Sequence, residues 1–297
     1  MTSLSIHHKT TYRYRSPVAF GPHRLMLRPR ESRELRLTGF ELTVAPRASV
    51  SWAHDVWGNA VATTGFHATG DTIAIDSVAR IDLDAVAWPV FDIAASAIVY
   101  PFRYSDTDWT DLGALTALQY PDPHGRLLAW ARGFVRGSAT DTLALLKDLG
   151  AGVADAVLYQ SRDEEGTQSP LATLDRGWGS CRDFAVLFAE AARCLGFGAR
   201  IVSGYLHAAV PGVVGSQATH AWAEVFVPGA GWITIDPTNR SVGSANLIPV
   251  AVARDIRQAV PVAGSFVGAS DALLGMTVEV SVSEVPGEIP YCRMTPG

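Results

Sequence analysis

Apolar residues recur every three or four positions in the segment that follows Ser180, and this spacing is the strongest helical signal in the chain. The predicted buried stripe consists of Phe184, Leu187, Phe188, Ala191, Ala192 and Leu195. Ser180 followed three residues later by Asp183 is a typical helix start, and Gly196 is a typical stop. The pattern therefore predicts a helix of about four turns with Cys181 in its first turn.

Residues 1–95 instead alternate between apolar and polar side chains, and short turns rich in Gly and Pro separate the alternating segments. The clearest alternating segments are 10–14, 39–44 and 71–78. This pattern predicts a β-sandwich of short strands. Residues 52–59 resemble a strand, a tight Gly-Asn turn and a second strand, so we interpret His54 and Asp55 as solvated turn residues rather than as a site.

Helical patterns return in residues 111–150, and the polar, acidic stretch 161–169 predicts an exposed loop ahead of the Cys181 helix. After that helix, three alternating segments predict strands at 199–206, 219–227 and 232–239. We expect an α+β chain with two domains, an N-terminal β-sandwich domain at 1–98 and a second domain at 99–297. Within the second domain we expect a helical lead-in at 110–160, a core at 170–240 and a C-terminal strand segment at 241–290.

The last two of these strands form a predicted hairpin whose register decides which polar side chains meet. If the loop spans Val227 to Gly231, Phe226 faces Trp232, and His220 and Asp236 become diagonal neighbours on one face. A four-residue loop would place these two side chains on opposite faces unless a bulge intervened. The hairpin thus predicts an imidazole oriented by a carboxylate.

Cys181 has the position of a reactive thiol, because the first turn of a helix offers unpaired N–H groups and the positive end of the helix dipole. Both favour the thiolate, which is the nucleophilic form. With His220 and Asp236, Cys181 would complete the nucleophile, base and orienting group used in acyl transfer. The alternative from the residues alone is that Cys181 is a small buried side chain without a chemical role.

Composition narrows the function classes. The 297 residues are 48% hydrophobic and carry a net charge of −5, which gives no electrostatic case for nucleic-acid binding. No stretch reaches about 18 apolar residues, so no membrane span is expected, and no secretory signal is evident at the start. Three cysteines without framework spacing predict reduced thiols and a cytoplasmic setting. Five arginines between Arg24 and Arg36 are interpreted mainly as solvated faces of strands and a loop.

The other candidate residues give weaker signals. Cys194 falls on a different helix face from Cys181 and is expected to be buried. Cys292 carries no signal, and His207 is interpreted as a polar residue at a strand end. Paired zinc-ligand spacing is absent, so neither a metal nor an organic cofactor is expected.

Three segments resemble, in the right order, the motifs of the bacterial transglutaminase-like superfamily: 179–185, 219–225 and 231–239. The segments 6–14 and 25–30 are similar to the β domain that precedes the catalytic domain in one bacterial branch, and 246–255 is similar to that branch's closing segment. The resemblance implies a papain-like second domain, in which the cysteine helix packs on an antiparallel sheet. It also implies that Cys181, His220 and Asp236 are the catalytic triad.

The resemblance implies a cysteine enzyme that forms a thioester with the carbonyl of a peptide or carboxamide. Water would then release an acid, as in a peptidase or amidase, or an amine would form a new amide, as in a transglutaminase. We favour hydrolysis because water needs no acceptor pocket. Tyr159, Ser180 and Trp222 are candidates for an oxyanion donor or a pocket wall, and the expected partner is a peptide or protein substrate. A non-catalytic binding or scaffold protein is the alternative, and the oligomeric state is open.

Overall fold

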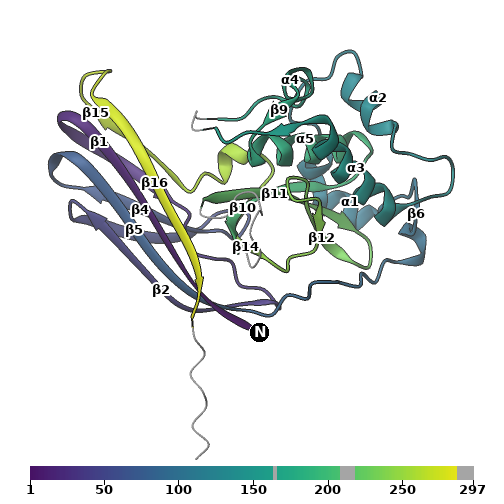
Figure 1. The fold of residues 1–297 in the computed structure, drawn as a ribbon, viewed down its shortest axis with the longest axis horizontal. Coiled ribbons are helices and arrows are strands. Elements are labelled where there is room, and N and C mark those ends of the chain that lie inside the picture. The colour runs from purple at the N-terminus through teal and green to yellow at the C-terminus, as the bar shows by residue number, and fades with distance from the viewer. Residues whose placement is uncertain (163–165, 208–217, 286–297) are drawn as a thin grey trace, which may run out of the picture.

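The computed structural model describes residues 1–162, 166–207 and 218–285. It contains a curved β-sheet part, in which the N-terminus lies, and a mixed part with helices around a second sheet beside it (Figure 1). The predicted α+β fold, with β structure first and the cysteine helix in the second part, is confirmed.

The N-terminal part is a seven-stranded sheet organised around β1 (Thr2–Leu25). The strands of this sheet other than β1 are β2 (Leu35–Ala45), β3 (Ala48–His54), β4 (Ala60–Phe66), β5 (Thr69–Leu83), β15 (Val262–Val267) and β16 (Leu273–Glu284). The strands β1 and β5 have 24 and 15 residues, so they are longer than the short strands expected from the sequence. The register of β1 against β5 shifts between Arg13 and Val18, where β1 bends along the sheet.

The two last strands do not extend the second domain but pair with β1. Antiparallel pairing joins β1 to β16 from Leu4 and Glu284 to Tyr14 and Leu273, and it joins β1 to β15 near Phe20. The sequence analysis had assigned 241–290 to the second domain. Pairing between segments more than 230 positions apart leaves no local mark in the sequence, which is why alternation alone predicts the strands but not their partners.

The second part contains an antiparallel five-stranded sheet in the order β13-β12-β11-β10-β14. Its strands are β10 (Ala199–Leu206), β11 (Thr219–Val227), β12 (Gly231–Asp236), β13 (Ser241–Val242) and β14 (Leu247–Ala253). The helices are α1 (Asp106–Leu112), α2 (Arg126–Arg132), α3 (Thr142–Ala156), α4 (Pro170–Arg176) and α5 (Cys181–Cys194), with 3-10 turns at Ala95–Ala97, Gly113–Thr116 and Ile256–Gln258. Two short ladders complete it, β6 (Val99–Tyr100) with β7 (Thr140–Asp141), and β8 (Leu158–Tyr159) with β9 (Trp178–Gly179).

The predicted cysteine helix is confirmed as α5, and its apolar stripe lies in the core of the second part. Phe184, Leu187 and Phe188 are buried and belong to the same cluster as Ala221 and Ala223 of β11. The chain leaves the helix through a glycine with a φ of +89°, as expected for a helix stop. No helix in the described ranges is both long and apolar enough to cross a membrane.

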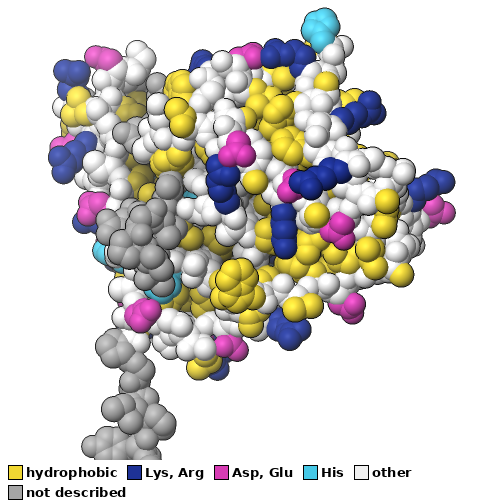
Figure 2. Space-filling model, turned by 45° about the vertical axis from the view of Figure 1, so that its right-hand side comes forward, with side chains coloured by type: hydrophobic (Ala, Val, Ile, Leu, Met, Phe, Trp, Pro, Cys, Tyr) yellow, Lys and Arg dark blue, Asp and Glu magenta, His cyan; other side chains and the backbone are white. Residues whose placement is uncertain are grey.

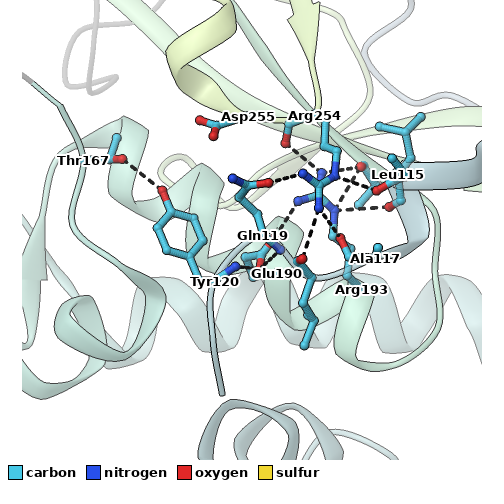
Figure 3. A network of polar contacts seen from close by, with 12 residues as sticks. Leu115, Ala117, Gln119, Tyr120, Thr167, Glu190, Arg193, Arg254 and Asp255 are labelled. Carbon is cyan, nitrogen blue, oxygen red and sulfur yellow. Dashed lines mark hydrogen bonds and ion pairs between the residues drawn. The ribbon is translucent and has the colours of Figure 1, made fainter. Parts of the chain in front are cut away.

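A buried polar network ties α5 to the chain around it (Figure 3). Glu190 Oε2 accepts hydrogen bonds from the backbone N–H groups of Gln119 and Tyr120, at 2.8 and 3.0 Å. Arg193 pairs with Glu190 and donates to backbone carbonyls, among them those of Ala199 and Arg254. Since both charges are buried, this satisfied pair fixes the helix relative to the segment before α2 and to the strand β10.

The surface mixes charges of both signs. On the face drawn in Figure 2, basic and acidic side chains lie interspersed among hydrophobic ones. Several arginines of the early cluster have structural partners: Arg24 pairs with Asp55, and Arg36 pairs with Asp82. The guanidinium of Arg28 lies over the ring of Phe40, so part of this cluster stabilises the sheet rather than facing only solvent.

Candidate active site

Cys181 is the first residue of α5 and is 8% exposed. Ser180 directly precedes it, and the buried carboxylate of Asp183 accepts hydrogen bonds from Ser180 N at 2.8 Å and from Ser180 Oγ at 2.9 Å. Asp183 also accepts from Gln168 N at 2.7 Å, which holds the end of the preceding loop against the helix. The hydroxyl of Ser180 therefore serves the helix start, because it already donates to Asp183.

The hairpin has the register that the five-residue loop predicts. Phe226 pairs with Trp232, and His220 and Asp236 share a face. The distance between His220 Nε2 and Asp236 Oδ2 is 2.8 Å, and both side chains are fully buried. Since a carboxylate only accepts hydrogen bonds, Nε2 carries the proton of this bond. This arrangement fixes the orientation of the imidazole ring.

The carboxylate of Asp236 is itself held by the turn that follows β12. Its Oδ1 accepts from Thr238 N at 3.0 Å and from Asn239 N at 3.3 Å. Its Oδ2 accepts from Asn239 Nδ2 at 2.8 Å in addition to His220. Sequence analysis missed Asn239, although its position three residues after the aspartate is a typical side-chain turn spacing.

Cys181 is one of the groups that raise the pKa of the same imidazole. Burial alone lowers the pKa of His220, but its hydrogen bonds to Asp236 and Cys181 and the charges of these two groups outweigh burial and raise the pKa to about 10. Because Nε2 is hydrogen-bonded to Asp236, Nδ1 is the ring nitrogen that remains to accept the thiol proton. Among the residues that the structure describes, Nδ1 is buried and makes no hydrogen bond of good geometry. Proton exchange between the sulfur and Nδ1 requires one of the two side chains to move into hydrogen-bond geometry.

Two further predicted residues line this site. Tyr159 is 37% exposed, and burial together with the charge of Cys181 raises the pKa of its hydroxyl. Its backbone lies beside the chain that leads to Cys181, because β8 pairs in parallel with β9 and Gln160 N donates to Gly179 O at 2.9 Å. Trp222 forms a buried wall, with its ring 6.0 Å from the ring of His220.

The remaining candidates lie elsewhere. Cys194 is at the far end of α5, where burial and the charges of Asp122 and Glu190 raise its pKa to about 12. His207 Nε2 lies 3.7 Å from Glu284 of β16. Cys292 lies outside the described residues. In the part of the chain that the structure describes, no group of three or more His, Cys, Asp or Glu side chains is arranged to hold a metal ion.

Two family models match the chain. Residues 4–82 match the bacterial transglutaminase-like N-terminal region, and residues 128–237 match the transglutaminase-like superfamily core. An uncharacterized protein of Mycobacterium tuberculosis is 27% identical over 295 residues, with 95% of this chain and 92% of the relative covered. One of Mycobacterium leprae is 25% identical over 292 residues, with 95% and 99% covered.

Among solved structures, the chain is similar to the crystal structure of a "Putative Cysteine Protease" from Cytophaga hutchinsonii. The TM-score is 0.72 at 20% sequence identity, and the alignment covers 97% of this chain and 92% of the other. That similarity concerns the fold. The match to the superfamily core includes all three motif segments of the sequence analysis, except the last two residues of the third segment. Residues 128–237 thus carry a transglutaminase-like superfamily core, and the bacterial transglutaminase-like N-terminal region precedes it at residues 4–82.

Proposed function

We propose that the protein is a cysteine enzyme that transfers acyl groups from peptide or carboxamide carbonyls, with Cys181, His220 and Asp236 as its triad. The observation that carries the proposal is the buried contact of His220 with Asp236, which leaves Nδ1 to the thiol of the first residue of α5. The match to the superfamily core supports cysteine-based catalysis in general. The proposal involves no metal or organic cofactor.

In the first step, the sulfur of Cys181 bonds to the substrate carbonyl carbon while His220 Nδ1 holds the thiol proton. The carbonyl oxygen becomes an oxyanion, and the positive end of the helix dipole at the start of α5 stabilises it. The tetrahedral intermediate then collapses: the C–N bond breaks, His220 gives its proton to the departing amine, and a thioester remains. We assign the Tyr159 hydroxyl as a second donor to the oxyanion, since the charge of Cys181 already acts on it.

In the second step, an acceptor attacks the thioester after His220 removes its proton, and Cys181 leaves as the thiol when the proton returns. With water the product is an acid, and with a primary amine it is a new amide. We propose hydrolysis as the main reaction, with a peptide or protein as substrate in a cytoplasmic setting. Asp236 keeps the imidazole in the tautomer that both steps need.

The test is incubation of the full chain with a peptide library, with and without a primary amine, followed by mass spectrometry. Cleavage with gain of water supports hydrolysis, and gain of the amine supports transfer. Cys181→Ala must abolish either change, whereas Cys194→Ala must not, because that thiol lies at the other end of α5. A wild-type protein that leaves every peptide unchanged would contradict the proposal and favour a binding or scaffold role.

A further inference from the structure

The turn between β3 and β4 in the N-terminal sheet is built around the carboxylate of Asp55. Its Oδ1 accepts hydrogen bonds from the backbone N–H groups of Trp57 and Asn59, both at 2.9 Å. Its Oδ2 accepts from the side-chain amide of Asn59 at 2.9 Å. Gly58, with a φ of +71°, permits the tight reversal. Because the turn is fixed from within, the side chains of Trp57 and Asn59 are held in defined directions.

Asn59 joins this turn to the edge of the second sheet. Its amide is fully buried: Nδ2 donates to Val252 O at 2.8 Å, and Val252 N donates to Oδ1 at 2.9 Å. Arg30 also donates to Oδ1, at 2.6 Å. Because β14 is the last strand of its sheet, the N–H and C=O of Val252 need a partner, and one amide supplies both hydrogen bonds. The turn therefore docks at one defined position on β14.

Trp57 packs against the cluster of buried apolar side chains that contains Trp222, the neighbour of His220. The cluster that it contacts consists of Val202, Leu206, Trp222, Leu247 and Val252. Within it, Trp222 is fully buried and its ring lies at 32° to the ring of His220. Trp222 also lies against β10, where a Cβ added to Gly204 would come within 2.8 Å of its ring. Trp222 is thus held between the strand backbone and the cluster that Trp57 closes.

We propose that the Asp55–Asn59 turn is a positioning element of the active site, in which Trp57 keeps Trp222 against the imidazole of His220. The inference rests on the proposed function, because it makes His220 the group whose position matters. It gives the N-terminal β part a role in the chemistry: this part supports the wall that keeps water away from the contact between His220 and Asp236.

The electrostatics of His220 provide a readout for this role. The titratable groups that act on it are Asp236 from β12 and Cys181 from α5. Their attraction to the imidazolium is strong because the site is dry, and it outweighs the opposing effect of burial. If loss of Trp57 lets water reach the ring, both effects shrink, and the pKa of His220 moves from about 10 toward its ordinary value of 6.5.

The experiment titrates the His220 imidazole by nitrogen-15 NMR in the full chain without substrate, for Trp57→Leu and Trp57→Phe. We expect the midpoint to fall by about one pH unit in the leucine variant and by about half a unit in the phenylalanine variant, in the order of side-chain size. Circular dichroism checks that each variant is folded, and if the leucine variant is not, the phenylalanine variant alone decides. A folded variant with an unchanged midpoint would overturn the proposal.

The matched control is Tyr205→Phe, which removes the 3.0 Å hydrogen bond between Tyr205 and His8 at another point of the contact between the two parts. It should leave the midpoint unchanged. An equal shift in this variant would assign the effect to general loosening of the contact and would overturn the positioning role of Trp57. Since no substrate is present, a catalytically inactive wild type would refute the proposed function without affecting this measurement.

Discussion

Replacement of Asp236 by Asn tests the centre of the proposed mechanism, because it keeps the shape of the side chain and removes its charge. The carboxylate accepts from His220 and Asn239 through Oδ2, and from two backbone N–H groups through Oδ1. An amide offers only one oxygen. If this oxygen faces the backbone donors, the NH₂ group faces Nε2 and forces the proton to Nδ1, where His220 no longer accepts the proton of Cys181.

The expected size of the effect follows from two steps. A charge-assisted hydrogen bond contributes about 1.5–3 kcal/mol, which corresponds to about one to two pKa units. The pKa of His220 should therefore fall from about 10 to between about 8 and 9, or lower if the tautomer changes. A loss of about 2 kcal/mol from the attraction between the imidazolium and the thiolate corresponds to about thirtyfold, so alkylation of Cys181 at pH 7 should slow by up to that factor. The higher intrinsic nucleophilicity of a more basic thiolate reduces this to about tenfold.

The assay is the rate of modification by limiting iodoacetamide from pH 5 to 10, with the labelled residue identified by mass. The difference between wild type and D236N should be largest near neutral pH and should vanish above about pH 9, where an ordinary thiol ionises without help. The matched control is Asp155→Asn, which removes a surface carboxylate that pairs with Arg240 at 2.7 Å. A folded D236N protein that is alkylated at the wild-type rate at pH 7, or an equal loss in the control, would refute the reasoning.

Three further predictions concern labelling, the α5 network and acid stability. Under limiting iodoacetamide Cys181 should be modified well before Cys194, whose pKa is raised to about 12 by burial and nearby acids, and equal labelling would contradict an activated Cys181. Arg193→Met should destabilise the fold by about 3–5 kcal/mol in urea denaturation, because it leaves the carboxylate of Glu190 buried without its partner. The double variant with Glu190→Gln should regain part of the lost stability. Burial lowers the pKa of His8 to about 4, so on acidification the unfolded state binds a proton at this residue before the folded state does. The stability of the fold should therefore fall as the pH drops from about 6.5 to 4. His8→Gln should remove about 3 kcal/mol of this fall, as measured by denaturation at both pH values.

The parts of the site that could be predicted from sequence are those encoded locally. Ser180 and Asp183 mark the helix start within four residues, and the capping contact is present. The loop after β11 sets the hairpin register, and this register alone brings His220 and Asp236 to one face. In both cases, short-range geometry determines which side chains meet, so neither inference needs knowledge of the rest of the fold.

What could not be predicted depends on contacts between distant segments. The pairing of β16 with β1 follows from packing of the whole sheet, since Val280 is buried together with Ile6 and with Tyr205 of β10. The sequence names Tyr159 as a candidate but does not show what brings it to Cys181. That depends on a two-residue parallel ladder, which is too short to leave an alternating pattern. Such contacts are selected by three-dimensional complementarity and not by the local spacing of apolar residues.

The Asp55–Asn59 turn shows why a polar segment can be misinterpreted. From sequence, Gly-Asn between two strands predicts a solvated turn, because polar residues at turns usually face water. The structure leaves His54 exposed, as expected, but the side chain of Asp55 is only 19% exposed, and Asn59 is completely buried against Val252. The local sequence is the same whether the side-chain amide of a turn hydrogen-bonds to the edge of a distant strand or faces solvent. Only the identity of its hydrogen-bond partner distinguishes the two cases. That partner belongs to the sheet that carries His220, so a turn that resembles a simple connection joins the N-terminal part to the sheet of the candidate active site.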